Sequence, residues 1–181
     1  MLRKIPLAAL TLFLAVNFIS AQTASCDSQS FQGVCILHIN EITASSTAIG
    51  NPTTGTVGSI IGDPRDGHSH QGIDIFNKVG TPVVAFEAGV VVIANNAGSG
   101  LCGKEVSVKH PDGRRSIYCH LDTVAVSQGQ RISKGQRLGT MGKTGNAHDT
   151  PPHLHFEIRL GSAIIDPCTL LECRRGSALT A

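Results

Sequence analysis

The sequence predicts an all-β domain with mostly antiparallel strands. From residue 58 onwards, short runs of β-branched and apolar residues alternate with glycine-containing turns, a pattern typical of many short strands. In residues 105–109 (Glu-Val-Ser-Val-Lys) the two valines alternate with polar residues and therefore share one face of a strand. The expected strands are residues 72–76, 81–86, 89–94, 105–109, 116–120, 123–126 and 154–159.

The segment before this domain has two parts. Arg3 and Lys4 precede an apolar run that ends at Val16, and small residues follow at Ser20 and Ala21, which is the layout of a secretory signal. The run is shorter than the roughly 20 residues that span a bilayer. We therefore expect residues 1–21 to be a signal peptide, residues 22–57 an N-terminal extension, residues 58–167 the folded domain and residues 168–181 a C-terminal tail.

The charge of the chain argues against nucleic acid as a partner. The full sequence has 15 Lys+Arg and 13 Asp+Glu, and two of the basic residues lie in the predicted signal. The remaining chain is formally neutral when its histidines are uncharged, whereas nucleic-acid binding requires a basic surface. We expect a secreted or periplasmic monomer with no membrane span in its mature form.

Six cysteines follow the predicted signal, and an even number in an exported chain indicates up to three disulfides. Cys102 and Cys119 stand on either side of the turn residues 111–113 (Pro-Asp-Gly), so they would face each other across a hairpin. Zinc binding by cysteines is less favoured because the sequence contains no Cys-x-x-Cys spacing.

A short helix is expected near the C-terminus. Asp166 can cap it, Pro167 suits its first position, residues 170–175 can continue it and Gly176 can end it. Cys168 and Cys173 would then lie about 7.5 Å apart along the helix axis, too far for a disulfide. Either the helix is shorter, or these cysteines pair elsewhere, for example with Cys26 and Cys35.

The segment His153-Leu-His155 predicts two imidazoles side by side. In a strand, residues two apart point to the same face, with Cα atoms about 6.6 Å apart. His153 and His155 would project together, and Leu154 and Phe156 would face the core. Glu157 continues the histidine face and could orient one of them.

The segment His70-Gln-Gly-Ile-Asp74 offers an imidazole and a carboxylate. A straight strand would separate His70 and Asp74 by about 13 Å. A helix is disfavoured by Gly72 and the β-branched isoleucines. We therefore expect a bend at Gln71-Gly72, with His70 folding back towards Asp74. Two histidines and one aspartate are a suitable ligand set for a catalytic zinc with one open position.

A further imidazole, His120, follows Tyr118 and Cys119 at the end of an expected strand. Alternation places Tyr118 and His120 on one face and Cys119 on the other, which leaves His120 free to enter a cleft. The other histidines lack such a context, and we expect them to be surface or loop residues: His38, His68, His110 and His148.

Four segments resemble the lysostaphin-type (LytM-like) zinc metallopeptidases: residues 67–75, 81–85, 118–121 and 152–157. They include the H-x-G-x-D and H-x-H motifs of that family, and the resemblance covers roughly residues 58–167. It implies a mostly antiparallel β fold with a narrow active-site groove. It also implies that His70, Asp74 and His155 bind Zn²⁺ and that His120 and His153 are catalytic.

The resemblance implies hydrolysis of peptide bonds in bacterial peptidoglycan, in stem peptides or cross-bridges. A bound zinc makes water more acidic and polarises a carbonyl, while histidines can accept a proton and stabilise an oxyanion. The sequence does not decide which of His120 and His153 is the base. Relatives that have lost ligands act as activators or signalling proteins, so a non-enzymatic module is the alternative. A carrier domain is disfavoured because no suitably placed lysine is present.

Overall fold

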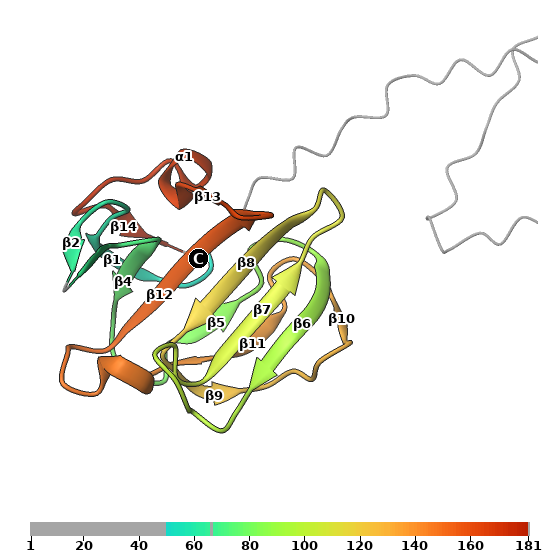
Figure 1. Cartoon of the computed structure of the whole chain (residues 1–181). Helices are drawn as coiled ribbons and strands as arrows, with labels where there is room; N and C mark the ends of the chain where they lie inside the picture. Colours follow the sequence, from blue (N-terminus) through green and yellow to red (C-terminus); the bar gives the residue numbers. More distant parts are fainter. Residues whose placement is uncertain (1–49, 66, 181) are drawn as a thin grey trace, which may run out of the picture. The chain divides into compact units, whose positions relative to one another are not determined.

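The computed structural model describes residues 50–65 and 67–180, which form a nine-stranded sheet, a three-stranded sheet and a two-stranded hairpin (Figure 1). All strand pairings in these ranges are antiparallel, which confirms the predicted fold class. The elements are β1 (Gly55–Ser59), β2 (Pro64–Arg65), β3 (His68–Ser69), β4 (Ile73–Phe76), β5 (Pro82–Val84), β6 (Gly89–Asn95), β7 (Glu105–Lys109), β8 (Arg114–Cys119), β9 (Leu121–Val124), β10 (Arg131–Ile132), β11 (Arg137–Met141), the 3₁₀ turn η1 (Gly145–Ala147), β12 (His153–Leu160), β13 (Ala163–Ile165), α1 (Pro167–Leu171) and β14 (Ala178–Leu179).

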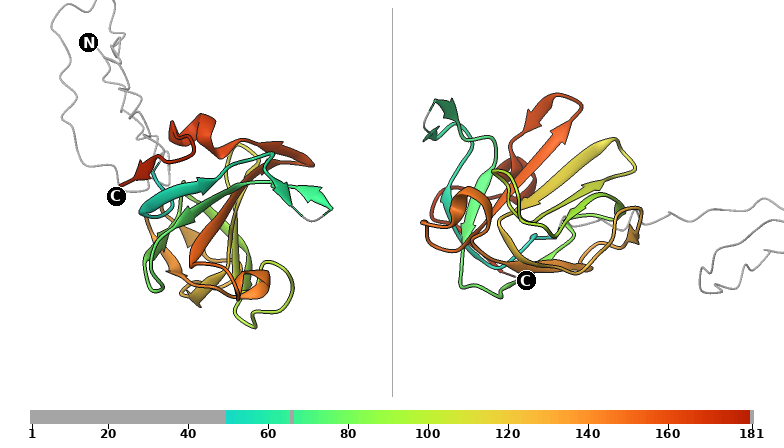
Figure 2. Two further views of the ribbon diagram at one scale, coloured as in Figure 1. Left: turned by 90° about the vertical axis from the view of Figure 1, so that its left-hand side faces the viewer. Right: turned by 60° about the horizontal axis from the view of Figure 1, so that its bottom comes forward.

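The two larger sheets pack against each other. The large sheet has the order β10-β6-β7-β8-β12-β4-β1-β14, and β13 also pairs with β12. Figures 1 and 2 show the small sheet, β5-β11-β9, lying against one face of β6, β7 and β8. One core cluster draws on both sheets, with Val106 and Val108 from β7, Val83 from β5 and Leu138 from β11. Burying each such side chain contributes roughly 1.5–3 kcal/mol, which holds the layers together.

The strand β12 organises the large sheet because it pairs with three others. Its first half pairs with β4, its longer second part pairs with β8, and its end pairs with β13. Leu154, Phe156 and Ile158 are fully buried in the core, as their alternation predicts. The opposite face of β12 is therefore left for His153, His155 and Glu157.

The C-terminal segment completes the same sheet. β14 pairs with β1, and Leu171 and Leu179 join the core cluster. These residues belong to the segment 168–181 that the sequence indicated as a tail, and within the described chain they extend the sheet at the edge next to β1.

The predicted helix is shorter than its sequence pattern indicated. Asp166 caps α1 by accepting the N–H of Cys168 at 2.9 Å, and Pro167 occupies the first position. The helix ends after five residues because Glu172 adopts a left-handed backbone with φ of 51°. This turn brings Cys168 and Cys173 within 4.5 Å at their Cα atoms, and the two form a disulfide. Of the two alternatives, the shorter helix is therefore correct.

The favoured pairing of Cys102 with Cys119 is present. β7 and β8 form a hairpin in which Val106 lies opposite Tyr118, and the two cysteines have Cα atoms 4.9 Å apart. The disulfide joins the loop before β7 to the last residue of β8. Cys26 and Cys35 lie outside the described residues, so their pairing stays a prediction.

His110 lies in a turn between β7 and β8, as the expectation of a surface or loop residue allows, but it is buried and not on the surface. The residue is 2% exposed and lies at the turn end of the β7–β8 hairpin. Nδ1 donates to the carbonyl oxygen of Ala88 at 2.9 Å, so Nε2 accepts the hydroxyl proton of Ser116 at 2.8 Å. Ser116 Oγ lies 3.0 Å from the hydroxyl of Tyr118, which accepts the N–H of Phe86. The pattern missed this network because the partners of His110 come from other segments.

Two further expectations concern the membrane and the exposed histidines. Among residues 50–65 and 67–180, no helix has the length and apolar character needed to cross a bilayer. The predicted signal and His38 lie outside the described residues. His68 and His148 are exposed, as expected.

The two described disulfides should differ in their effect on stability. They close segments with sequence separations of 17 and 5 residues. Because a longer closed loop removes more entropy from the unfolded chain, Cys102→Ser with Cys119→Ser should lower the free energy of unfolding by about 3 kcal/mol, against about 2 kcal/mol for Cys168→Ser with Cys173→Ser. Urea denaturation of both double variants measures this order, and the reverse order would contradict it.

Candidate metal centre and active site

The candidate site lies where three neighbouring strands meet in register. His155 of β12 lies opposite Asp74 of β4 on one side and opposite Cys119 of β8 on the other. Paired residues on adjacent strands point to the same face of the sheet. The register therefore places Asp74 beside His155, with the end of β8 next to them.

His70 reaches this point through the expected bend before β4. Gly72 sits in the bend, and a Cβ atom on it would lie 2.3 Å from the carbonyl oxygen of Phe156. Only glycine allows the chain to pass this close to β12. The close passage folds His70 back, and its Nε2 lies 3.1 Å from Oδ1 of Asp74.

Three potential ligand atoms converge in this place. Nδ1 of His155 lies 2.9 Å from both Oδ1 of Asp74 and Nε2 of His70. Atoms bound about 2.0–2.1 Å from one tetrahedral zinc are roughly 3.3 Å from one another, so an outward movement of a few tenths of an ångström would seat the ion. His70, Asp74 and His155 form the one cluster of three or more potential metal ligands found within the described residues.

Each of these residues has an outer partner that orients it. Nδ1 of His70 donates to the carbonyl oxygen of Ile60 at 2.9 Å, so its Nε2 offers a lone pair to the centre. Nε2 of His155 lies 2.9 Å from Oε1 of Glu157, the partner that strand alternation predicted. Oδ2 of Asp74 accepts from Arg65 at 2.6 Å. These contacts turn one acceptor atom of each residue towards the same point.

The site attracts positive charge. Burial opposes ionisation of Asp74, but its interactions with His155 and His70 outweigh burial and hold the pKa of that carboxyl well below its usual range. Burial also disfavours the charged form of His155 and so lowers its pKa. Hydrogen bonds to Asp74 and Glu157 outweigh burial and raise the pKa of His155 to about 9. A proton can occupy one of these atoms, whereas a divalent cation can be held by all three. The donor set therefore fits a metal ion.

His153 and His120 border the same centre. Nε2 of His153 lies 3.9 Å from Oδ1 of Asp74, and its Nδ1 donates to the carbonyl oxygen of Pro151 at 2.9 Å. The ring of His120 lies 4.9 Å from that of His153 and 5.9 Å from that of His155, measured between centroids. All five residues that the sequence singled out are thus brought together.

The predicted orientation of His120 relative to Tyr118 is wrong. Tyr118 faces the core, with its ring 5.2 Å from that of Phe156. Alternation would send His120 into the core as well, but β8 ends at Cys119 and His120 has a left-handed backbone with φ of 63°. This conformation costs about 1–2 kcal/mol for a residue with a Cβ atom, and it turns the imidazole towards His153.

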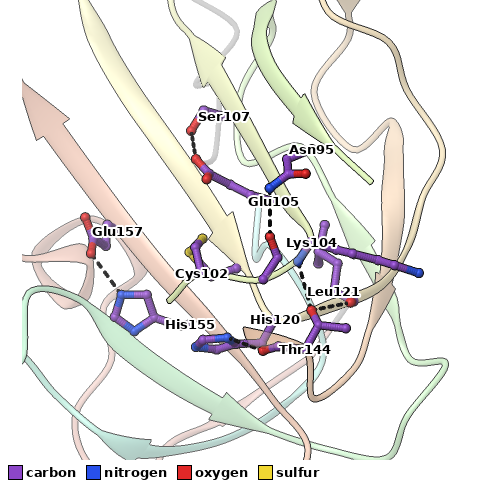
Figure 3. Close-up of a disulfide and its surroundings, with 12 residues drawn as sticks. Asn95, Cys102, Lys104, Glu105, Ser107, His120, Leu121, Thr144, His155 and Glu157 are labelled. Atoms are coloured by element: carbon purple, nitrogen blue, oxygen red, sulfur yellow. Dashed lines mark hydrogen bonds and ion pairs between the residues drawn. A yellow bond between two sulfur atoms is a disulfide. The ribbon is translucent and has the colours of Figure 1, made fainter. Parts of the chain in front are cut away.

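His120 is held in one tautomer. Its Nδ1 donates to the carbonyl oxygen of Thr144 at 2.9 Å, which leaves Nε2 as the acceptor (Figure 3). Burial and the nearby charges of His153 and His155 lower the pKa of His120 to about 4. The imidazole is therefore uncharged at neutral pH and can accept a proton.

Sequence patterns did not identify Arg65, Thr144 or the carbonyl oxygen of Ile60 as part of the site. Arg65 lies in a short hairpin, and the spacing of nine residues to Asp74 gives no sign that the two meet. The other two contribute backbone carbonyl groups, which any residue carries. Only the surrounding fold reveals their roles.

Comparisons with known proteins agree with this geometry. The model of Peptidase family M23 matches residues 68–167. Murein hydrolase activator NlpD from Escherichia coli K12 is 37% identical over 123 residues, which are 68% of this chain and 31% of NlpD. Peptidoglycan DD-endopeptidase ShyA from Vibrio cholerae is 38% identical over 103 residues, 53% of this chain and 23% of ShyA. The chain thus matches less than a third of the length of these relatives.

A solved structure shows the same arrangement of strands. The catalytic domain of the antimicrobial peptidase lysostaphin from Staphylococcus simulans is 31% identical, with a TM-score of 0.54 over 68% of this chain and 91% of that domain. The matched family segment contains all five residues of the candidate site. Together, the fold, the clustered residues and the family match show that this chain belongs to peptidase family M23.

Proposed function

We propose that this protein is a secreted or periplasmic zinc metalloendopeptidase that hydrolyses peptide bonds in bacterial peptidoglycan, in stem peptides or cross-bridges. One observation carries the proposal. The acceptor atoms of His70, Asp74 and His155 converge within 3.1 Å of one another, and two further histidines border that point. Two histidines, one carboxylate and an open position are the usual ligand set of a hydrolytic zinc site.

His70, Asp74 and His155 would hold the zinc. When bound there, zinc would act as a Lewis acid that polarises a peptide carbonyl and makes water more acidic. The outer contacts with Ile60 and Glu157 keep the two ligand imidazoles in the orientation that this binding requires. Arg65 balances the remaining charge of the Asp74 carboxylate.

His120 and His153 would handle the proton and the developing charge. Nε2 of His120 carries a lone pair, because Nδ1 donates to Thr144, and it can accept the proton of an attacking water. Nε2 of His153 is likewise the free acceptor of its ring. After one imidazole takes a proton, it can donate a hydrogen bond to the oxyanion or return the proton to the leaving amine. The two residues share these roles.

The names of the relatives support peptidoglycan as the target. ShyA is a peptidoglycan DD-endopeptidase, and NlpD is a murein hydrolase activator. NlpD also supports a second candidate, a non-enzymatic module that stimulates another hydrolase. The presence of all three potential ligands together with both bordering histidines favours the enzyme.

Purified peptidoglycan distinguishes the two candidates. The zinc-loaded protein should release fragments with new peptide termini, which mass spectrometry would identify, and a chelator should abolish the release. Readdition of zinc should restore it. If no new termini form with zinc, yet the protein accelerates an added murein hydrolase, the activator is correct and the proposed peptidase activity is refuted.

Substitution His155→Ala should lower the zinc affinity by more than about 100-fold, since even the loss of an outer partner typically costs 10–100-fold. Elemental analysis after dialysis against a limiting zinc buffer measures the bound metal. The matched control is His148→Ala. His148 is an exposed histidine whose ring bonds to the carbonyl oxygen of Gly145 and not to the ligand cluster. Equal zinc content in the wild type and His155→Ala would refute the ligand assignment.

Substitution His120→Ala should retain zinc and lower kcat about 10²–10⁴-fold, which is the usual contribution of general acid–base catalysis. The rate is measured on purified peptidoglycan, and the zinc content is measured on the same sample. Undiminished hydrolysis by a zinc-loaded His120→Ala protein would remove this residue from the mechanism.

A further inference from the structure

The backbone at His120 is held by the loop that precedes β7. His120 donates its backbone N–H to the carbonyl oxygen of Cys102 at 2.8 Å. The backbone N–H of Leu121 donates to the carbonyl oxygen of Lys104 at 3.1 Å. The disulfide joins Cys102 to Cys119, the residue directly before His120. Three links between two short segments thus hold the chain where β8 ends and the left-handed residue begins.

Thr144 provides a second support. Its carbonyl oxygen accepts the Nδ1 proton of His120, as described above. Its hydroxyl accepts the N–H of Lys104 and donates to the carbonyl oxygen of Leu121, both at 2.9 Å (Figure 3). One residue therefore sets the tautomer of the imidazole and joins the loop of Cys102 to the chain that follows His120.

The two supporting loops are in close contact. A Cβ atom on Gly103 would lie 2.5 Å from Oγ1 of Thr144, and one on Gly145 would lie 2.3 Å from the carbonyl oxygen of Leu101. Both glycines have left-handed backbones, with φ of 66° and 70°. The same carbonyl of Leu101 accepts the N–H of Asn146 at 3.0 Å. A shift of the Cys102 loop would therefore move Thr144 as well.

The supports of the metal ligands come from other residues. His70 is oriented by Ile60, His155 by Glu157, and Asp74 by Arg65. Asp74 and His155 themselves lie in the paired strands β4 and β12. Apart from Cys119, which lies opposite His155 in β8, the residues that position His120 thus differ from those that orient the ligand set.

We propose that the Cys102–Cys119 disulfide and the Thr144 hydroxyl are positioning elements for the His120 imidazole, which set the rate of hydrolysis and leave metal binding unchanged. The proposal rests on the proposed function, in which His120 accepts a proton. A displacement of about 1 Å in a reacting group can lower a rate about 100-fold. Because His120 has an unfavourable left-handed backbone, its imidazole needs these supports to stay in place.

The first test removes the disulfide. Cys102→Ser with Cys119→Ser should lower kcat about 10–100-fold on soluble peptidoglycan fragments, with KM and zinc content within about twofold of the wild type. The matched control is Cys168→Ser with Cys173→Ser, which removes the other described disulfide. It should retain the wild-type kcat at a temperature at which both variants are folded. Equal kcat values for the two double variants would overturn the proposal.

The second test needs no change to the disulfides. Thr144→Val removes the hydroxyl and keeps the backbone carbonyl and the size of the side chain, whereas Thr144→Ser keeps the hydroxyl. The valine variant should lose kcat, and the serine variant should restore it to near the wild-type value. This pair decides the matter if the cysteine variant fails to fold. A valine variant with the wild-type kcat would overturn the role of Thr144.

A third readout does not depend on turnover. Long-range ¹H–¹⁵N spectra of histidine-labelled, zinc-loaded protein identify the protonated ring nitrogen, and His120→Ala assigns the signal. The wild type should show a single Nδ1–H tautomer at His120. Thr144→Val and the Cys102–Cys119 variant should lose it, because the loop that carries the Thr144 carbonyl oxygen is then no longer anchored beside His120. If the wild type cuts no peptide yet shows this behaviour, the proposed function fails and the positioning role stands. An unchanged tautomer in both variants would refute the positioning role.

Discussion

The register of β12 between β4 and β8 is the constraint on which the site depends. It places His155 beside Asp74, and it brings the end of β8 to the same row. Because successive side chains of a strand point to opposite faces, a slip by one residue would send both histidines of β12 into the core and bring Leu154 and Phe156 to the surface. Burial of these two apolar residues therefore fixes the position of the ligands. The candidate metal centre is in this sense a product of core packing.

The sequence predicted the parts of the fold that have strong local patterns. Residues 105–109 and 154–159 alternate clearly, and both are strands. Seven strands were not expected, among them β1 and β11 with five residues each. The two-residue strands β2, β3, β10 and β14 have no period and form only against a partner. Side-chain chemistry singled out five residues that the structure brings together, but it did not predict the face of His120, since the sign of φ at His120 cannot be inferred from residue type. The helix end was misplaced for the same reason: Glu172 already adopts a left-handed conformation and ends the helix before Gly176, whose φ is also positive.

Strands and loops position different residues of the candidate site. Asp74 and His155 lie within paired strands, whereas His120 lies between β8 and β9 and depends on loops from two other parts of the chain. Loops accept sequence change more readily than paired strands do. The fold can therefore keep its potential ligand cluster while the geometry of His120 varies. Such a division suits a family whose members here include a named endopeptidase and a named activator.

A buried network of hydrogen bonds limits how this core can evolve. It links Phe86 to Ala88 through Tyr118, Ser116 and His110. Hydrogen bonds link these groups one after another, from the N–H of Phe86 at one end to the carbonyl oxygen of Ala88 at the other. Replacing a middle member leaves each of its neighbours short of one buried hydrogen bond, at about 1–3 kcal/mol for each group left unsatisfied. Replacing all three with apolar residues avoids most of that loss. Tyr118, Ser116 and His110 should therefore show strong epistasis and change together or not at all.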